Sequence, residues 1–146
     1  NNMYQIVQTD DYVMIMVEMA HDARIIPIDK DHRPDAWKPW LGDSVAHWDG
    51  DVLVVETRNL HPQQAPRNVA ALSEEGVVVE RFSRFSDEQV LYEFEVRDPI
   101  FYTEAWSGEM AFNTTDTQPY EYACHEGNYG LPGILAGARR LEMDEQ

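Results

Sequence analysis

The densest group of side chains that could do chemistry lies in the run from Glu121 to Tyr129. His125 is a candidate general base, because the unperturbed imidazole pKa of about 6.5 lies near neutral pH, and Glu126 is a candidate acid. On an extended strand Glu121 and His125 share a face but lie roughly 13 Å apart, so a catalytic partner must come from another strand. The alternative is a strand end whose polar groups serve a turn.

Smaller groups of the same kind are His21 beside Asp22, His47, and Asp43 beside Ser44. An Asp beside a His can hold the imidazole in one tautomer, and Asp43 could activate Ser44 or a water. These pairs also suit ordinary turns, in which Asp and Ser side chains bond to their own backbone. An enzyme hypothesis therefore takes as its catalytic residues His125, Glu126, His21, Asp43 and His47.

The histidines do not form a recognisable metal-binding motif, because none of the five is paired with another at zinc-site spacing. His125-Glu126 opens like the helical zinc-protease motif, but Tyr129 stands where the second histidine is needed. No cofactor and no metal ligand are predicted. The remaining alternative is a metal site assembled from distant strands by His21, His47 and His125.

Aromatic residues are frequent in the second half of the chain, and most of them belong in a β core. Where a barrel leaves a cavity, such rings line an apolar pocket with phenolic hydroxyl groups inside it. The predicted ligand-binding residues are Tyr92, Phe94, Tyr102, Trp106, Tyr120, Tyr122 and Trp48.

Short runs rich in β-branched and aromatic residues must position these groups. They predict strands over residues 3–9, 11–20, 23–28, 47–48, 52–55, 77–85, 90–97, 100–106, 109–113 and 119–125. Asp49-Gly50 suits a tight hairpin turn, and the apolar residues on both faces of Tyr12–Val17 indicate a strand covered on both sides.

Longer polar and Pro-containing stretches separate some of these strands, and we predict long loops over residues 29–42 and 59–75. Leu131, Ile134 and Leu135 recur at helical spacing, which predicts a helix over residues 131–142 packed against the outside or the mouth of the sheet. Strands joined almost entirely by hairpins favour a meander over a βαβ fold. The sequence thus predicts one mainly β domain over residues 1–146, an antiparallel meander curled into a lipocalin-like barrel or half-barrel with one short C-terminal helix.

Length and charge narrow the class of protein. A chain of 146 residues is long enough for one domain with a real core. Its 27 acidic and 11 basic residues give a formal net charge of −16, which argues against nucleic acid and against an anionic membrane surface as partners. No apolar run approaches the length of a membrane span. Cys124 is the single cysteine, so no internal disulfide is expected.

Several segments resemble a large family of uncharacterised bacterial proteins that is frequent in soil and marine bacteria. They include W-L-G-D-S at 40–44, H-W-D-G-D-V-L-V-V at 47–55 and E-Y-A-C-H-E-G-N-Y at 121–129. The resemblance implies a lipocalin-like domain with no established activity. Members usually look exported and carry an upstream segment with a Gly-x-Trp strand. An exported or periplasmic location is therefore implied, and because this chain opens without a signal peptide or that segment, we expect a trimmed or shortened form.

Three functions fit these patterns. The first is a lipocalin-like domain that binds a small, largely apolar molecule in an aromatic-lined cavity. The second is a small β-barrel enzyme, either a hydrolase, a lyase or an isomerase, that uses His and carboxylate acid–base chemistry. The third is an interaction domain whose open sheet edge pairs with a partner or with a second copy in a homo-oligomer. The expected partner of the first two is a small molecule, neither nucleic acid nor a membrane.

Overall fold

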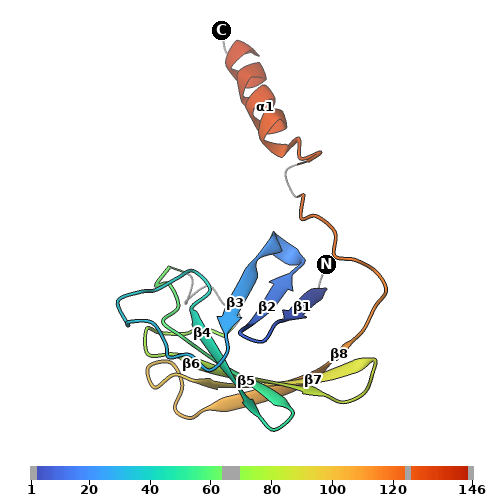
Figure 1. The fold of residues 1–146 in the computed structure, drawn as a ribbon. Helices are drawn as coiled ribbons and strands as arrows, with labels where there is room; N and C mark the ends of the chain where they lie inside the picture. The colour runs from blue at the N-terminus through green and yellow to red at the C-terminus, as the bar shows by residue number, and fades with distance from the viewer. Residues whose placement is uncertain (1–2, 64–69, 124–125, 145–146) are drawn as a thin grey trace.

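Eight strands are arranged in two antiparallel sheets, followed by one helix. The computed structural model describes residues 3–63, 70–123 and 126–144. Each strand pairs with its neighbours in the sequence, so both sheets are meanders (Figure 1). Sheet A contains β1 (Tyr4–Gln8), β2 (Tyr12–Val17) and β3 (Ala23–Pro27), with a 3-10 turn η1 (Met19–His21) before β3. Sheet B contains β4 (Asp43–Asp49), β5 (Val52–Arg58), β6 (Val77–Arg84), β7 (Gln89–Arg97) and β8 (Trp106–Asn113). These sheets confirm the predicted mainly β class.

The core lies where sheet A crosses sheet B (Figure 1). Alternation along β2 turns Val13 and Ile15 toward sheet B, and Ile26 lies directly opposite Val13 on β3. Leu53 and Val55 of β5 meet them from the other side. All five side chains are buried, so removal of apolar surface from water holds the two layers together.

The two sheets are joined differently at their two edges. Ile28 forms a parallel bridge with Ala46, and the Asp29 N–H donates to the Ala46 carbonyl at 2.8 Å. We call this edge, where β3 meets β4, the closed side. At the opposite edge β1 and β8 have no further strand partner among the described strands, and their rings Tyr4 and Phe112 stack instead. We call this edge the open side. The described strands therefore form no closed barrel, and that part of the prediction is wrong.

The strand prediction fails at two places near the end of sheet B. Residues 100–105 are not a strand, because the Asp98 carboxylate accepts hydrogen bonds from the backbone N–H groups of Ile100 at 2.9 Å and Phe101 at 3.1 Å. These bonds hold a turn, so β8 begins only at Trp106 and continues through the predicted gap before residue 109. Residues 119–123 also contain no strand, and residues 124–125 lie outside the described residues.

The predicted hairpin turn at Asp49-Gly50 forms between β4 and β5. The turn between β4 and β5 passes through Gly50 at φ +60°, with Asp49 opposite Val52. A positive φ suits glycine here because it has no Cβ to clash with the backbone. The described residues of 29–42 and 59–75 contain no helix and no strand.

The C-terminal helix α1 (Gly130–Asp144) forms where helical spacing predicts it. The expected packing against the sheet is wrong, because no residue of α1 is buried and the helix stands clear of both sheets (Figure 1). Among the described residues, no helix is both long enough and apolar enough to cross a bilayer.

Candidate ligand-binding site

A series of aromatic rings runs from the open side into the space between the sheets. Tyr4 of β1 stacks on Phe112 of β8, with ring centroids 5.1 Å apart and planes 11° apart. Phe112 stacks on Tyr92 of β7 at 5.0 Å, and Tyr92 lies 5.7 Å from Phe94. Trp106 closes the series with an edge-to-face contact to Phe94 at 5.6 Å. The strand register explains the series, because directly opposed residues of β7 and β8 share the inner face.

Gly108 makes room for this series. It lies directly opposite Phe94, and a Cβ built at Gly108 would come within 2.7 Å of the Phe94 ring. No side chain larger than hydrogen fits there without displacing the ring. The missing Cβ thus lets Phe94 lie flat over β8 and continue the stack.

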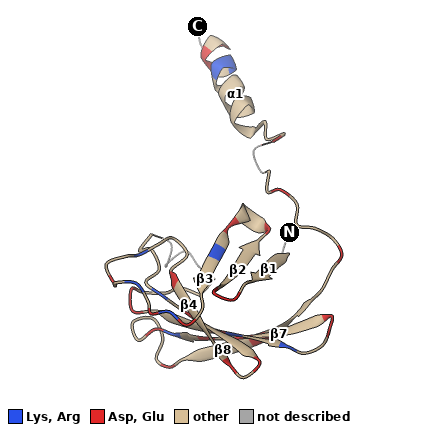
Figure 2. Ribbon diagram, viewed as in Figure 1, with Lys and Arg blue, Asp and Glu red and all other residues tan. Residues whose placement is uncertain are grey.

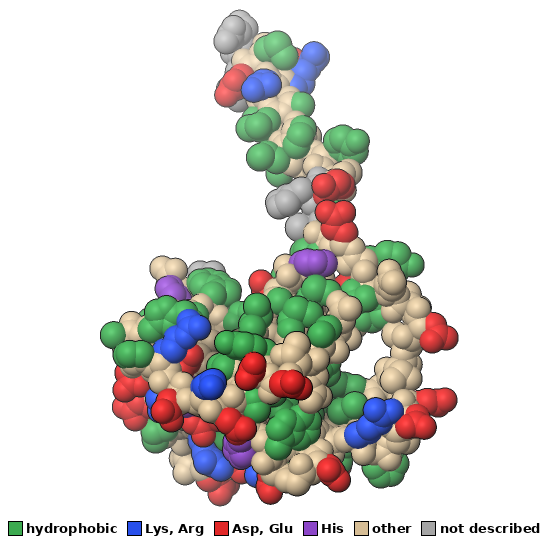
Figure 3. All heavy atoms as spheres, viewed as in Figure 1, with side chains coloured by type: hydrophobic (Ala, Val, Ile, Leu, Met, Phe, Trp, Pro, Cys, Tyr) green, Lys and Arg blue, Asp and Glu red, His purple; other side chains and the backbone are tan. Residues whose placement is uncertain are grey.

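A cavity of about 940 Å³ opens beside the outermost rings at the open side. Its apolar wall comes from Tyr4 and Ile6 of β1, Val90 of β7, and Met110 and Phe112 of β8. Its polar rim is the segment from 113 to 119 that follows β8. Figure 3 shows this segment arching away from the body of the molecule. The cavity is therefore apolar on the strand side and hydroxyl- and amide-rich on the other.

A largely buried ion pair lies beside Tyr92, in the middle of the ring series, and links the two sheets. Arg24 of β3 holds Glu80 of β6 through two hydrogen bonds, from Nη1 to Oε2 at 2.6 Å and from Nη2 to Oε1 at 2.9 Å. The Tyr92 hydroxyl donates to Glu80 Oε1 at 3.0 Å. Behind them, the Ser44 and Thr57 hydroxyl groups bond to each other at 2.7 Å. A bidentate pair of this kind fixes the distance and orientation of its two strands.

These contacts set the protonation states of the inner groups. Burial disfavours the charged Arg24 guanidinium, but the Glu80 carboxylate outweighs burial and raises the pKa of Arg24. Burial, and then the same carboxylate, raise the pKa of Tyr92 well above its ordinary value. Tyr92 is thus a protonated hydrogen-bond donor at neutral pH, not a phenolate base.

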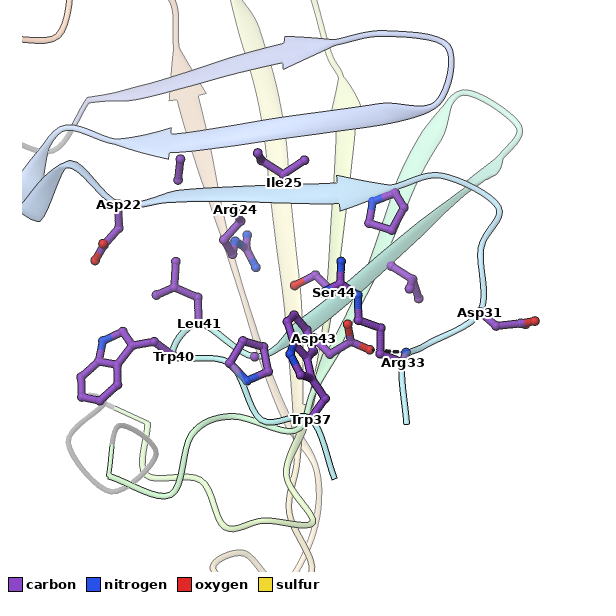
Figure 4. A pocket seen from close by; sticks show the side chains of 15 residues that line it. Asp22, Arg24, Ile25, Asp31, Arg33, Trp37, Trp40, Leu41, Asp43 and Ser44 are labelled. Carbon is purple, nitrogen blue, oxygen red and sulfur yellow. Dashed lines mark hydrogen bonds between the residues drawn. The ribbon is translucent and has the colours of Figure 1, made fainter. Parts of the chain in front are cut away.

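A second cleft, of about 340 Å³, lies at the closed side between β3, β4 and the loop that joins them (Figure 4). Arg24 points into it from β3, Ser44 lies on β4, and Trp37 and Trp40 come from the loop. The Arg33 guanidinium stacks on the Trp37 ring, 4.0 Å from its centroid. The lining mixes charged and apolar side chains in similar measure, and Arg24 is already held by Glu80 outside the cleft.

His32 holds the loop of this cleft on the surface of sheet B. Its Nδ1 lies 2.8 Å from Asp43 Oδ2, and its Nε2 lies 3.2 Å from Glu56 Oε1. The same Asp43 oxygen accepts the Arg33 backbone N–H at 2.9 Å. Both ring nitrogens of His32 are therefore bonded to carboxylates, which suits positioning of the loop better than proton transfer to a substrate.

The structure scatters the predicted catalytic residues that it describes. His47 is exposed on β4, His21 is exposed at the end of η1 with φ +57°, and Glu126 is exposed in a turn before α1. Asp43 is buried, but its carboxylate bonds to His32 and not to Ser44, which bonds to Thr57. His125 lies outside the described residues. No group of three or more His, Cys, Asp or Glu residues in the described part of the chain could hold a metal ion.

The predicted ligand-binding residues divide into two groups. Tyr92, Phe94 and Trp106 belong to the ring series, and Tyr102 joins its inner end through an edge-to-face contact with Trp106 at 6.0 Å. The other three are exposed and make no ring contact with the described part of the series: Trp48, Tyr120 and Tyr122.

Sequence reasoning missed Tyr4 and Phe112, which form the outer end of the ring series, as well as Arg24, Glu80 and His32. Arg24 and Glu80 did leave a signal, because each is a charged residue whose inward-facing neighbours on the strand are apolar: Ile26 for Arg24, and Val78 and Phe82 for Glu80. For Tyr4 and Phe112 the sequence holds no such signal, since β1 and β8 are far apart in the chain and meet only in the fold.

Comparison of the chain with protein-family models, with curated protein sequences and with solved structures finds no significant match. The family resemblance and the location that it implies therefore stay predictions.

Proposed function

We propose that this protein is a half-barrel, lipocalin-like domain that binds a small, largely apolar molecule at the open side. The observation that carries the proposal is the cavity of about 940 Å³ between β1, β8 and the segment 113–119, whose lining includes the rings of Tyr4 and Phe112. This volume lies within the range of roughly 300 to 1,000 Å³ that is usual for small-molecule sites. The apolar wall supplies binding energy, and the polar rim supplies groups that can orient a ligand.

The composition of the wall favours a ligand with a flat, unsaturated part. One face of the Tyr4 ring stacks on Phe112, and the residue is still 48% exposed. An aromatic face that remains in contact with water gains free energy when a second ring or a conjugated chain covers it. A flat ligand that covers Tyr4 would lengthen the existing series by one member without displacing any buried side chain.

The electrostatics of the chain favour a neutral or cationic ligand over an anionic one. The net charge of −16 gives the whole surface a negative potential, and Asp116 lies in the rim of the cavity. No Lys, Arg or His is among the described residues that line this cavity. An anion would therefore enter against the field without a partner inside.

A fluorescent probe of this chemistry, neutral N-phenyl-1-naphthylamine, tests the proposal by titration. We expect a saturable enhancement of the probe's fluorescence, with a stoichiometry of one probe per chain. Phe112→Ala removes the wall, and Met110→Glu places a charge on it while sparing the buried stack, so each should weaken the affinity for the probe at least tenfold, or about 1.4 kcal/mol. Phe85→Ala is the matched control, because Phe85 is 74% exposed in the β6–β7 turn and does not line the cavity.

Two outcomes would contradict the proposal. One is the absence of saturable binding by the wild-type chain. The other is that Phe112→Ala and Met110→Glu bind the probe as tightly as the control Phe85→Ala does. The probe would then occupy some other apolar surface. Circular dichroism of each variant shows that the sheets are retained.

A further inference from the structure

The helix α1 carries an apolar face that no part of the described chain buries. Leu131, Ile134, Leu135 and Leu141 recur at spacings that place them on one side of the helix, and Ile134 is 70% exposed. A helix of 15 residues is marginal by itself in water and normally gains its stability by packing such a face. The amphipathic pattern therefore calls for a partner surface.

The outer face of sheet A is a second apolar surface that the described residues leave partly exposed. The register places Val7, Met14 and Ile25 in one row across the three strands, on the side away from sheet B. Ile25 is 69% exposed, and Met16 and Pro27 lie on the same face. Figure 3 shows hydrophobic side chains gathered over these strands and again along α1. Apolar residues on both faces of β2 predict two covering layers, and only sheet B supplies one.

The outer face of sheet B is different and provides a comparison within the molecule. On the strands β6 to β8 it is formed mostly by charged and polar side chains: Arg81, Glu93, Glu95, Arg97, Ser107 and Glu109. An ordinary solvated sheet face has this composition. Sheet A therefore differs from a solvated face in the same chain.

We propose that α1 of one copy packs on the outer face of sheet A of a second copy, and that the second copy returns the contact. This interaction is separate from ligand binding at the open side. The dimensions fit, because a helix of 15 residues is about 22 Å long and strands of five or six residues are about 17 to 20 Å long. Three strands are wide enough to seat one helix. Two such contacts bury on the order of 1,000 Å², near the lower size of a specific interface.

The placement of the helix favours a second copy over the chain's own sheet. After β8 the chain leads away from the body, and α1 projects beyond sheet A (Figure 1), with no residue of the helix buried. Another copy can seat the helix as it stands, whereas closure within one chain requires the connecting segment to turn back. Each chain carries both surfaces, so reciprocal exchange gives a closed two-fold dimer without leftover sites.

Charges at the edges of the two surfaces are complementary only in part, because Glu142 falls on the apolar face of α1. Asp10 and Asp11 lie in the β1–β2 turn and Asp22 precedes β3, so both ends of sheet A are acidic (Figure 2). Arg139 follows Ala138 and so flanks the apolar face of α1. The net charge of −16 on each chain opposes association at long range. Salt screens that repulsion, so the dimer should be tighter in high salt.

Sedimentation velocity of the whole chain, across two decades of concentration and in low and high salt, tests the proposal. We expect a monomer–dimer equilibrium in the wild-type chain. Leu135→Glu on the helix and Ile25→Glu on sheet A should each raise the dimer dissociation constant at least tenfold. The controls Ala136→Glu, on the opposite side of α1, and Ile100→Glu, outside sheet A, add the same charge and should leave dimerisation unchanged. All four positions are exposed, and circular dichroism checks that each variant is folded.

Cross-linking identifies the occupant. A chain with Ile25→Cys and Leu135→Cys, in a Cys124→Ser background, is treated with a short bifunctional maleimide. Covalent dimers support the exchange. A link within a single chain overturns it in favour of intramolecular docking. A wild-type chain that stays monomeric throughout, or a dimer that neither Leu135→Glu nor Ile25→Glu weakens, also overturns it.

Discussion

The closed side and the open side of this molecule join the same two sheets by different means. On the closed side a backbone bridge connects β3 to β4, and the ion pair of Arg24 and Glu80 crosses from sheet A to sheet B. On the open side Tyr4 and Phe112 stack, and no hydrogen bond or ion pair joins β1 to β8 in the described part of the chain.

This difference determines which side can accommodate a ligand. Hydrogen-bonded charges fix an orientation, and leaving one partner buried and unpaired costs about 3 to 5 kcal/mol. A stacked ring pair is worth only about 0.5 to 1.5 kcal/mol beyond its buried area and tolerates sliding. The closed side therefore sets the angle between the sheets, and the open side can adjust around a ligand at little cost.

The largest effect is expected from breaking the ion pair with Arg24→Met. The Glu80 carboxylate would stay buried without its charge partner, so the free energy of unfolding should fall by about 3 to 5 kcal/mol. Urea denaturation followed by circular dichroism measures the change. Arg24→Met combined with Glu80→Leu should recover most of the loss, because no charge is then buried. Arg84→Met, which removes an exposed ion pair with Asp87, should leave the free energy nearly unchanged.

A loss in Arg24→Met no larger than that in Arg84→Met would show that the closed side is not held by this pair. So would a double variant as unstable as the sum of Arg24→Met and Glu80→Leu measured separately, since the two residues would then act independently.

Asp98 provides a reference for both sides, because it is a buried carboxylate that lies at neither of them. Burial alone would raise the pKa of Asp98, but backbone N–H groups of Ser73, Phe101 and Ile100 donate to its carboxylate and hold that pKa below its ordinary value. Asp98→Asn should lower the free energy of unfolding by about 2 kcal/mol at neutral pH. Urea denaturation at several pH values measures it.

The sign of the pH dependence follows from the direction of the shift. A pKa that is lower in the folded state stabilises the fold above the ordinary value of about 3.9, and this stabilisation is lost as the pH falls through the folded value. The difference between the wild-type chain and Asp98→Asn should therefore be constant near neutral pH and narrow below about pH 4. A difference that is unchanged in acid would show that the charge of Asp98 does not contribute.

Local patterns were sufficient for much of the fold. Alternation in β7, the Asp49-Gly50 turn and helical spacing after residue 130 each depend on neighbouring residues, and the structure forms all three elements. The predicted strand over 100–106 is wrong because Asp98 captures two backbone N–H groups, a competition that propensity does not contain. Whether the barrel closes depends on whether β1 pairs with β8, and these two strands lie far apart in the sequence.

The ring series was predictable only in its inner half, and none of the predicted ligand-binding residues is among the described residues that line the cavity. Tyr92, Phe94 and Trp106 lie on adjacent strands joined by one connection, so strand alternation places them together. Tyr4 meets Phe112 across the whole chain, and His32 meets Asp43 across a loop with no regular structure. Contacts of this kind depend on how the sheets cross, and a single sequence carries no periodic signal for that crossing.

The smallest effect on stability is expected at the open side, from Tyr4→Ala. Tyr4 is 48% exposed and is held by one stacking contact, so its loss should lower the free energy of unfolding by less than about 1 kcal/mol beyond the change in buried area. Affinity for N-phenyl-1-naphthylamine should nevertheless fall, because Tyr4 lines the cavity. Tyr12→Ala is the matched control: Tyr12 is equally exposed on the same sheet, but it lies on the outer face, so probe binding should persist. If Tyr4→Ala destabilises the protein as much as Arg24→Met does, both sides hold the sheets equally, and the open side has no freedom to admit a ligand.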